Sequence, residues 1–139
     1  MSGVLVDTNV LIAAYQAGGG DVLADRAKDV LEELAMRGDG YLSVQNLTEF
    51  SRVVQTRVAT PVPAAKVREA IAQLEQVFDV LRPSSRTVAR ALFGVEKHGL
   101  PFWDSMVWAV AHENGLSEVL TAAPPRAEIE GVRFRNPFA

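Results

Sequence analysis

Three acidic residues occupy positions from which a carboxylate could do chemistry. Asp7 directly follows the apolar run Val4–Val6 and precedes a helical pattern, so it ends a predicted strand. Ligands of parallel sheets bind at the carboxyl ends of the strands, which favours a site here. Asp104 falls in the first turn of one predicted helix and Glu49 lies within another. Each acid also has a structural explanation, because Asp is a favoured N-cap, an acid suits a helix N-terminus, and a Glu on a polar helix stripe is commonly exposed.

Several other kinds of site lack the residues they need. The chain has no cysteine, which excludes disulfides, thiolate zinc sites and cysteine nucleophiles. The glycines at 18–20 are not followed by the Lys and Ser or Thr of a phosphate-binding loop, and no GxGxxG follows the first strand. His98 and His112 form no HExxH pair, and no serine lies in a Gly-x-Ser-x-Gly sequence. Nucleotide binding of these kinds, zinc hydrolysis and serine hydrolysis are therefore unsupported.

The length and composition indicate one globular domain. The chain has 139 residues, of which 48% are hydrophobic and 22% are charged, and its formal net charge is −3. This balance provides a core for a single domain, which we predict over residues 1–139. No apolar stretch is long enough to span a membrane, and the first residues lack the basic start of a signal peptide. We therefore expect no membrane association and a cytoplasmic location.

The elements that must position the acids alternate between short strands and helices. Five strands are predicted at Val4–Val6, 41–42, 77–81, 118–121 and 132–134. Helices are predicted from Asp7 to residue 15 and over 21–38, 43–58, 64–76, 84–99 and 101–115. Asp21, Ser43 and Ser84 are the predicted N-terminal residues of the second, third and fifth of these helices, and Asp and Ser are favoured N-caps. Strands separated by helices pair in parallel through right-handed crossovers. We therefore predict an α/β fold, a doubly wound parallel sheet of about five short strands with helices on both faces.

Two further side-chain patterns were open to two interpretations each. The bases Arg82, Arg86, Arg90 and Lys97 recur at helical spacing, as in a solvated helix face or, less favoured, a phosphate-binding track. Trp103 and Trp108 flank Asp104 on one predicted helix. Packing in the core or in a dimer interface is favoured for them over stacking on a nucleobase.

Four segments together resemble the PIN domain, and most closely the VapC-type toxin ribonucleases. They are DTNVLIAAY at 7–15, LSVQNLTEF at 42–50, PFWDSMVWAVAHENG at 101–115 and EVLT at 118–121. The resemblance covers nearly the whole chain, including the terminal EGVRFRNPF. It implies that Asp7, Glu49 and Asp104 are the catalytic and metal-binding acids. It also implies that the site is supported by Thr8, Asn9, Gln45 and Thr121.

The implied cluster suits Mg²⁺ or Mn²⁺. Carboxylates brought together repel one another unless a cation joins them, and hard divalent cations prefer oxygen ligands. Mg²⁺ commonly takes only one or two protein carboxylates and keeps waters and substrate phosphate oxygens, so three acids suffice. Such an ion polarises a scissile phosphodiester and lowers the pKa of the attacking water. Asp7 and Asp104 are expected to be the principal ligands, with Glu49 helping to hold the ion and to orient the nucleophile.

The resemblance predicts a metal-dependent endoribonuclease that acts as the toxin of a toxin–antitoxin pair. It further implies an RNA substrate, a homodimer and an inhibitory antitoxin protein. One departure concerns the residues after the fourth predicted strand, where related proteins usually carry a fourth acid and this chain has Ala122 and Ala123. Glu128 and Glu130 follow in the next segment, and neither is favoured as a replacement.

Two alternatives follow from this departure and from the fold class. The first is a PIN-fold module that has lost catalysis and has kept RNA or protein binding. The second is a phosphoacceptor receiver domain, which also groups acids above a parallel sheet. A receiver would need a second acid paired with Asp7 and a lysine after a late strand, and the chain has neither.

Overall fold

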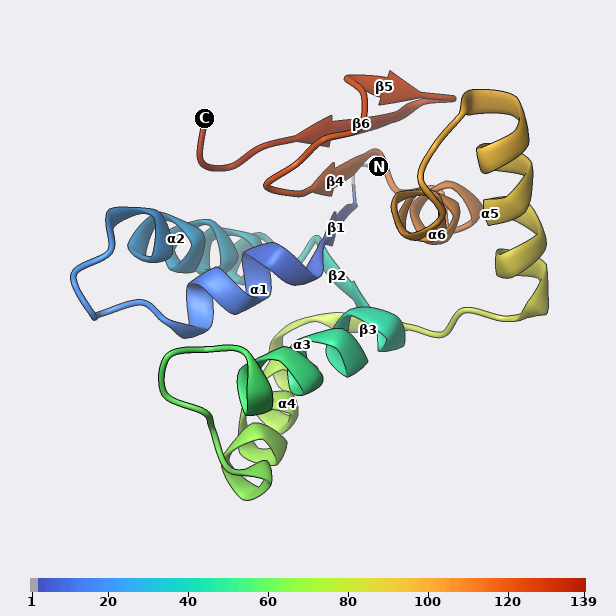
Figure 1. Ribbon diagram of the computed structural model, residues 1–139. Helices are drawn as coiled ribbons and strands as arrows, with labels where there is room; N and C mark the ends of the chain where they lie inside the picture. The colour runs from blue at the N-terminus through green and yellow to red at the C-terminus, as the bar shows by residue number, and fades with distance from the viewer. Residues whose placement is uncertain (1–2) are drawn as a thin grey trace.

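The computed structural model describes residues 3–139, in which one six-stranded sheet lies between two layers of helices (Figure 1). The strands are β1 (Val4–Val6), β2 (Gly40–Ser43), β3 (Asp79–Leu81), β4 (Glu118–Leu120), β5 (Glu128–Ile129) and β6 (Val132–Arg135). Their spatial order is β3-β2-β1-β4-β6-β5, and all neighbours pair in parallel except β5 and β6. The predicted α/β doubly wound architecture is confirmed. Residues 1 and 2 of the predicted domain, 1–139, lie outside the described residues.

The helices begin and end at the residues that local capping chemistry favours. They are α1 (Thr8–Tyr15), α2 (Val22–Arg37), α3 (Val44–Thr56), α4 (Ala64–Val77), α5 (Ser85–His98) and α6 (Phe102–Glu113). Asp21, Ser43 and Ser84 accept hydrogen bonds from the first backbone N–H groups of α2, α3 and α5. In residues 3–139 no helix is both long and apolar enough to cross a membrane.

The sheet is buried on both faces because successive strand side chains point to opposite sides. Val4 and Val6 of β1 pack into a core that includes residues of α1, α2, α3 and α4. Leu5, between them, packs into the other core with residues of α5, α6 and β6. Two hydrophobic cores therefore fix β1 from both sides. Asp7, the residue that follows β1, is consequently held at the carboxyl end of a strand that is packed on both sides.

The prediction of a wholly parallel sheet with about five strands was wrong in one respect. A sixth strand, β5, runs antiparallel to β6, with Ile129 opposite Val132. The two residues between them, Glu130 and Gly131, have φ values of 47° and 86°, the left-handed conformation that a two-residue hairpin turn requires. A strand of two residues is too short to show an alternating pattern, so the sequence predicts only β6 of this pair.

Two helix ends also differ from the sequence prediction. Val77 was assigned to the third strand, but it is the last residue of α4 and is half exposed. Val58 was assigned to the third helix, which ends at Thr56. Both residues lie next to an element boundary, where an isolated apolar residue fits a strand pattern and a helix pattern equally well.

The pair of helices α5 and α6 packs closely at Gly94. A Cβ atom at this position would meet the Ser105 hydroxyl oxygen and two ring carbons of Trp108, the latter at 3.0 and 3.1 Å. Gly→Ala usually stabilises an exposed helix by about 1 kcal/mol, whereas extra volume in a packed core costs about 1–3 kcal/mol. We expect Gly94→Ala to lower the free energy of unfolding by about 1–3 kcal/mol in urea denaturation. Adding Ser105→Ala should recover part of the loss, and a stabilised Gly94→Ala protein would contradict this packing.

Candidate active site

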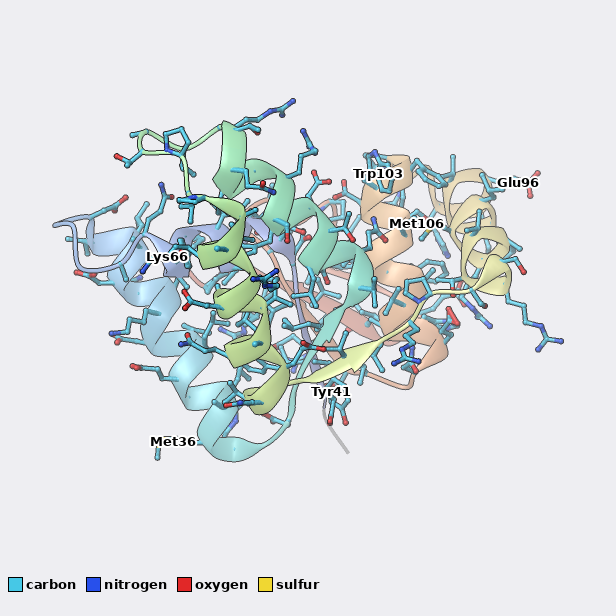
Figure 2. The ribbon with its side chains drawn as sticks, turned by 90° about the horizontal axis from the view of Figure 1, so that it is seen from below. Met36, Tyr41, Lys66, Glu96, Trp103 and Met106 are labelled. Atoms are coloured by element: carbon cyan, nitrogen blue, oxygen red, sulfur yellow. The ribbon has the colours of Figure 1, made fainter. Side chains whose placement is uncertain are left out.

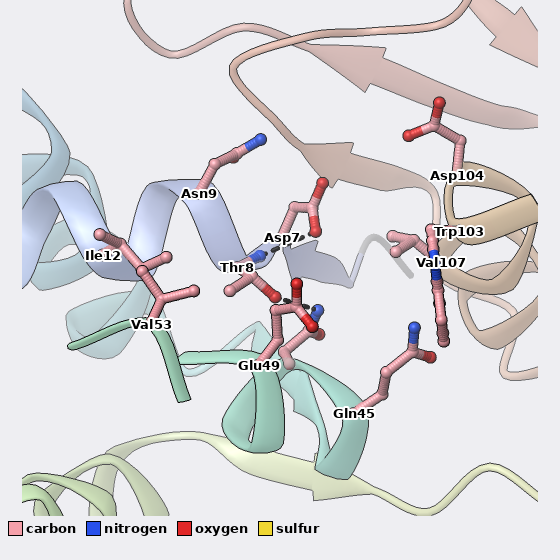
Figure 3. A pocket seen from close by; sticks show the side chains of 11 residues that line it. Asp7, Thr8, Asn9, Ile12, Gln45, Glu49, Val53, Trp103, Asp104 and Val107 are labelled. Atoms are coloured by element: carbon pink, nitrogen blue, oxygen red, sulfur yellow. Dashed lines mark hydrogen bonds between the residues drawn. The ribbon is translucent and has the colours of Figure 1, made fainter. Parts of the chain in front are cut away.

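A pocket of about 240 Å³ opens where α1, α3 and α6 meet at the carboxyl edge of the sheet (Figure 3). The pocket lies at the carboxyl end of β1, the strand between β2 and β4, where the strand order reverses. The pocket is lined by Asp7, Thr8, Asn9, Ile12, Gln45, Asn46, Glu49, Val53, Trp103, Asp104 and Val107. Six of the seven residues implied by the sequence resemblance are in this lining, and the seventh, Thr121, hydrogen-bonds to Asn9 beside it.

Asp7 both caps α1 and contributes a carboxylate to the pocket. Its Oδ1 accepts a hydrogen bond from the Thr8 backbone N–H at 2.8 Å, so the helix-cap explanation of Asp7 is correct. Burial raises the pKa of Asp7, hydrogen bonds from the Thr8 backbone and the Thr121 side chain oppose that rise, and the charges of Asp104 and Glu49 add to it. A helix cap does not require other acids nearby, yet the charges of Asp104 and Glu49, which belong to two other helices, act on Asp7.

The other two acids reach the pocket from α6 and α3. Asp104 is partly buried in the first turn of α6, and this burial raises its pKa. The Glu49 side chain is half exposed and pairs with Arg52 of the same helix at 3.3 Å. Figure 3 shows the carboxylates of Asp7, Glu49 and Asp104 around one opening. Within residues 3–139 no three acidic or histidine side chains form a ready-made metal site, so the three carboxylates share a pocket without forming one close cluster.

The donor set nevertheless fits a hard divalent cation. The three ionisable groups that line the pocket are all carboxylates, and their polar neighbours are amides and hydroxyls. Mg²⁺ prefers oxygen ligands and keeps several waters, so it needs only one or two of these carboxylates directly. The pocket volume is several times the roughly 30 Å³ that one water occupies in the liquid. A hydrated ion therefore fits between acids that do not touch one another.

Asn9 and Thr121 bind the start of α1 to the segment after β4. The Asn9 side-chain amide donates to the Thr121 hydroxyl at 3.2 Å and accepts from the Ala122 backbone N–H at 3.1 Å. The Thr121 hydroxyl also accepts from the Ala123 backbone N–H at 3.3 Å. The segment that lacks the fourth acid is thus held beside Asp7, but Ala122 and Ala123 add no carboxylate to the pocket.

Neither Glu128 nor Glu130 replaces that acid, because neither lines the pocket. Glu130 lies in the β5–β6 turn, where its carboxylate accepts from or pairs with His98 at 2.6 Å and approaches Lys97 at 3.9 Å. The hydrogen bond with His98 lowers the pKa of Glu130. This carboxylate therefore stabilises the packing of the turn against α5.

Asn46 is a polar residue of the pocket that was not predicted from the sequence, and neither were the apolar lining residues Ile12, Val53 and Val107. The Asn46 side chain is buried, and its amide donates to the Thr8 hydroxyl at 3.2 Å and accepts from the Ser43 backbone N–H at 3.1 Å. These bonds join the first turns of α1 and α3. Asp7 caps α1, and Glu49 lies one turn further along α3. The available signal was the spacing of Ser43 and Asn46, which is that of a capping box.

The basic stripe and the two tryptophans also occupy definite places. None of the four predicted bases lines the pocket, and two of them pair locally, Arg90 with His112 at 2.8 Å and Lys97 with Glu130. Trp108 is fully buried and donates its indole N–H to the Ile129 carbonyl at 3.2 Å, so core packing is confirmed for it. Trp103 is 65% exposed and lines the pocket, so core packing is wrong for it, whereas packing in a dimer interface stays a prediction.

The fold and the pocket define an α/β protein that presents acidic side chains at the carboxyl edge of a parallel sheet. The chain belongs to the PIN domain family, whose model matches residues 4–122. PIN domains are, as a family, nucleases. No curated protein sequence matches the chain at a significant level.

Solved structures of toxin proteins share this fold. A toxin–antitoxin complex from Klebsiella pneumoniae aligns with a TM-score of 0.71 and 20% identity, covering 98% of this chain and 98% of that one. VapC20 of Mycobacterium tuberculosis, described as a toxin that cleaves the sarcin–ricin loop, aligns at 0.64 and 22% identity, covering 84% and 87%. DNA-bound VapBC from Salmonella typhimurium aligns at 0.69 and 15% identity, covering 99% of both chains. At these identities the likeness establishes a common fold.

Proposed function

We propose that this protein is a metal-dependent endoribonuclease that acts as the toxin of a toxin–antitoxin pair. The observation that carries the proposal is that Asp7, Glu49 and Asp104, three acids far apart in the sequence, line one pocket at the carboxyl edge of the sheet. Membership of the PIN domain family and the common fold with VapC20 support the same activity. A phosphoacceptor receiver is disfavoured, because within residues 3–139 the pocket contains no lysine.

Asp7 and Asp104 are the proposed principal ligands of Mg²⁺ or Mn²⁺, directly or through water, with Glu49 assisting. Once bound, the ion supplies polarisation of the scissile phosphodiester and a lower pKa for the water that attacks in line. The raised pKa of Asp7 means that its buried charge lacks full compensation in the protein alone. A cation at this position provides that compensation, so the same burial that disfavours a free carboxylate favours metal binding.

The remaining residues of the pocket orient these groups. The Thr8 backbone N–H donates to the Asp7 carboxylate at 2.8 Å, and the Thr121 side chain lowers the pKa of Asp7 and so favours its ionised form. Asn46 fixes the Thr8 hydroxyl, and Asn9 fixes Thr121. Glu49 has an exposed carboxylate whose oxygens can accept a hydrogen bond from the nucleophilic water and so orient it.

The proposed partners are RNA, a cognate antitoxin and a second copy of the chain. Support for the antitoxin comes from the solved structures of similar fold, two of which are described as a toxin–antitoxin complex and as VapBC bound to DNA. Inhibition through the acidic pocket would require the antitoxin to present positive charge to Asp7, Glu49 and Asp104.

Cleavage of RNA by purified protein tests the proposal. We expect cleavage in Mg²⁺ or Mn²⁺ and none in EDTA, because among residues 3–139 no thiol or histidine lines the pocket that could act in place of a metal. Activity should return when the ion is restored in excess, and sequencing the new RNA ends should reveal preferred sites. Equal cleavage in EDTA would contradict metal dependence. RNA that is bound but never cut would favour the non-catalytic PIN module that the absence of an acid at Ala122 and Ala123 suggests.

A further inference from the structure

Trp103 is an exposed aromatic side chain at the edge of the acidic pocket. Its exposed fraction is 65%, and among the pocket residues in the described part of the chain it is the only aromatic one. Figure 2 shows it in the first turn of α6, with Met106 one turn further along the helix. A packed tryptophan removes about 150–250 Å² of surface from water. The fold forgoes most of that stabilisation at this position.

The indole is held in place although it is not buried. Phe102 contacts it edge to face, with ring centroids 5.2 Å apart and an angle of 68° between the ring planes. Trp103 is also the direct sequence neighbour of Asp104, so it belongs to the rigid first turn of a helix whose other side is buried. A flat, oriented apolar surface therefore lies one residue from a proposed metal ligand.

Gln45 brings a polar group to the same part of the pocket. Figure 3 shows the Gln45 side chain entering from α3 and the Trp103 indole extending from α6 on the same side of the pocket. Within residues 3–139 the Gln45 amide makes no hydrogen bond to another residue, although it is only partly exposed. An amide offers one acceptor and two donor hydrogens, which is the set needed to pair with the edge of a base.

We infer that Trp103 is the platform on which a nucleobase of single-stranded RNA stacks, with Gln45 hydrogen-bonding to the edge of that base. This inference rests on the proposed ribonuclease function and adds a base-binding subsite to it. Stacking on an aromatic ring is tolerant of base identity, because every base has a π face. Any preference among bases at this subsite comes from the Gln45 amide.

Intrinsic fluorescence reads this subsite directly, because the chain has two tryptophans and only Trp103 is exposed. Titration in EDTA with oligo(A), oligo(U) and an abasic oligomer of equal length keeps the RNA uncut and separates bases from phosphates. We expect both base-bearing oligomers to quench the emission and the abasic one to leave it unchanged. Kd is read from the fluorescence anisotropy of the same oligomers carrying a fluorescein label, since the Trp103 variants lack the reporting indole. Trp103→Ala should raise Kd about tenfold, a change of about 1.4 kcal/mol that lies within the range for base stacking.

Two further variants make the comparison specific. Trp103→Phe keeps an aromatic face and should retain most of the affinity. Phe93→Ala removes an exposed aromatic of α5 that does not line the pocket, and its Kd should equal that of the wild type. Circular dichroism confirms that each variant is folded.

Three results would overturn the inference. They are an unchanged Kd in Trp103→Ala, equal quenching of the wild type by the abasic oligomer, and protection of Trp103 from acrylamide that grows with protein concentration without RNA. The last result would place the indole between two copies. Cleavage in Mg²⁺ is measured in parallel. Cleavage with no effect of Trp103→Ala refutes only the stacking, whereas Trp103-dependent binding without cleavage supports the stacking and refutes only the ribonuclease.

Discussion

Asp104→Asn should reduce the rate of RNA cleavage by a factor of at least about one hundred while leaving the protein folded. Asn has the same shape as Asp but carries no charge, and loss of groups that merely orient metal ligands already costs about 10- to 100-fold. Asp104 lies in the first turn of α6, where removing a negative charge costs about 0.3–1 kcal/mol. Burial of that charge, which raises its pKa, offsets this cost. Initial rates and thermal melting should therefore separate activity from stability.

Asp25→Asn is the matched control for this experiment. Asp25 is also an acid in the first turn of a helix, α2, and it does not line the pocket. It experiences the same kind of helix-end field as Asp104, so a purely structural role for such acids predicts similar behaviour in both variants. We expect wild-type cleavage from Asp25→Asn. Wild-type cleavage from Asp104→Asn as well would remove α6 from the proposed site.

Asp7→Asn should make the metal-free protein more stable and remove most of its response to metal. Burial is the main reason that the pKa of Asp7 is raised, so the ionised carboxylate destabilises the native state at neutral pH. Asn caps a helix about as well as Asp, so the hydrogen bond from Thr8 is kept. We expect a rise of several degrees in the melting temperature in EDTA, since about 1 kcal/mol shifts a domain of this size by roughly 2–6 °C.

The response to metal should change in the opposite direction. Ion at about one hundred times its Kd stabilises the native wild type by about 2.7 kcal/mol, because it binds only the folded state. Asp7→Asn should lose most of this gain together with cleavage activity. Asp21→Asn, the same exchange at the N-cap of α2 away from the pocket, should change neither quantity by more than a few tenths of a kcal/mol. An unaltered metal response in Asp7→Asn would leave Asp7 as a helix cap only.

The pH dependence of stability has a definite sign for this residue. A carboxyl whose pKa is raised on folding binds its proton more tightly in the native state, so its contribution is fully favourable below the unfolded pKa and is lost as the pH rises through the folded pKa. The difference in melting temperature between Asp7→Asn and the wild type in EDTA should therefore shrink as the pH falls from neutral toward about 4. A difference that is constant over this range would assign the stabilisation to something other than charge.

Apart from β5 and the helix ends near Val58 and Val77, the order of the elements and their boundaries could be predicted because they depend on neighbours a few residues apart. Asp7, Asp21, Ser43 and Ser84 hydrogen-bond to backbone groups of the turn that follows them, and Gly38 and Gly99 end helices in a left-handed conformation. The apolar residues of β1 are buried on both sides, as a continuous run in a parallel sheet predicts. At each of the three positions a single carboxylate also has a structural explanation. The acids of the pocket were therefore identified from the resemblance of four sequence segments to the PIN domain.

The tertiary structure alone decided what each of these side chains contacts. Trp103 and Trp108 lie on the same helix among mostly apolar sequence neighbours. Trp103 is exposed at the pocket, whereas Trp108 is fully buried. Asn46 reaches Thr8 across 38 positions of the chain, and Glu130 turns to His98 on α5 instead of joining the pocket. The reason is that periodicity gives the face of a helix on which a residue lies, whereas its exposure and partners depend on which other elements cover that face.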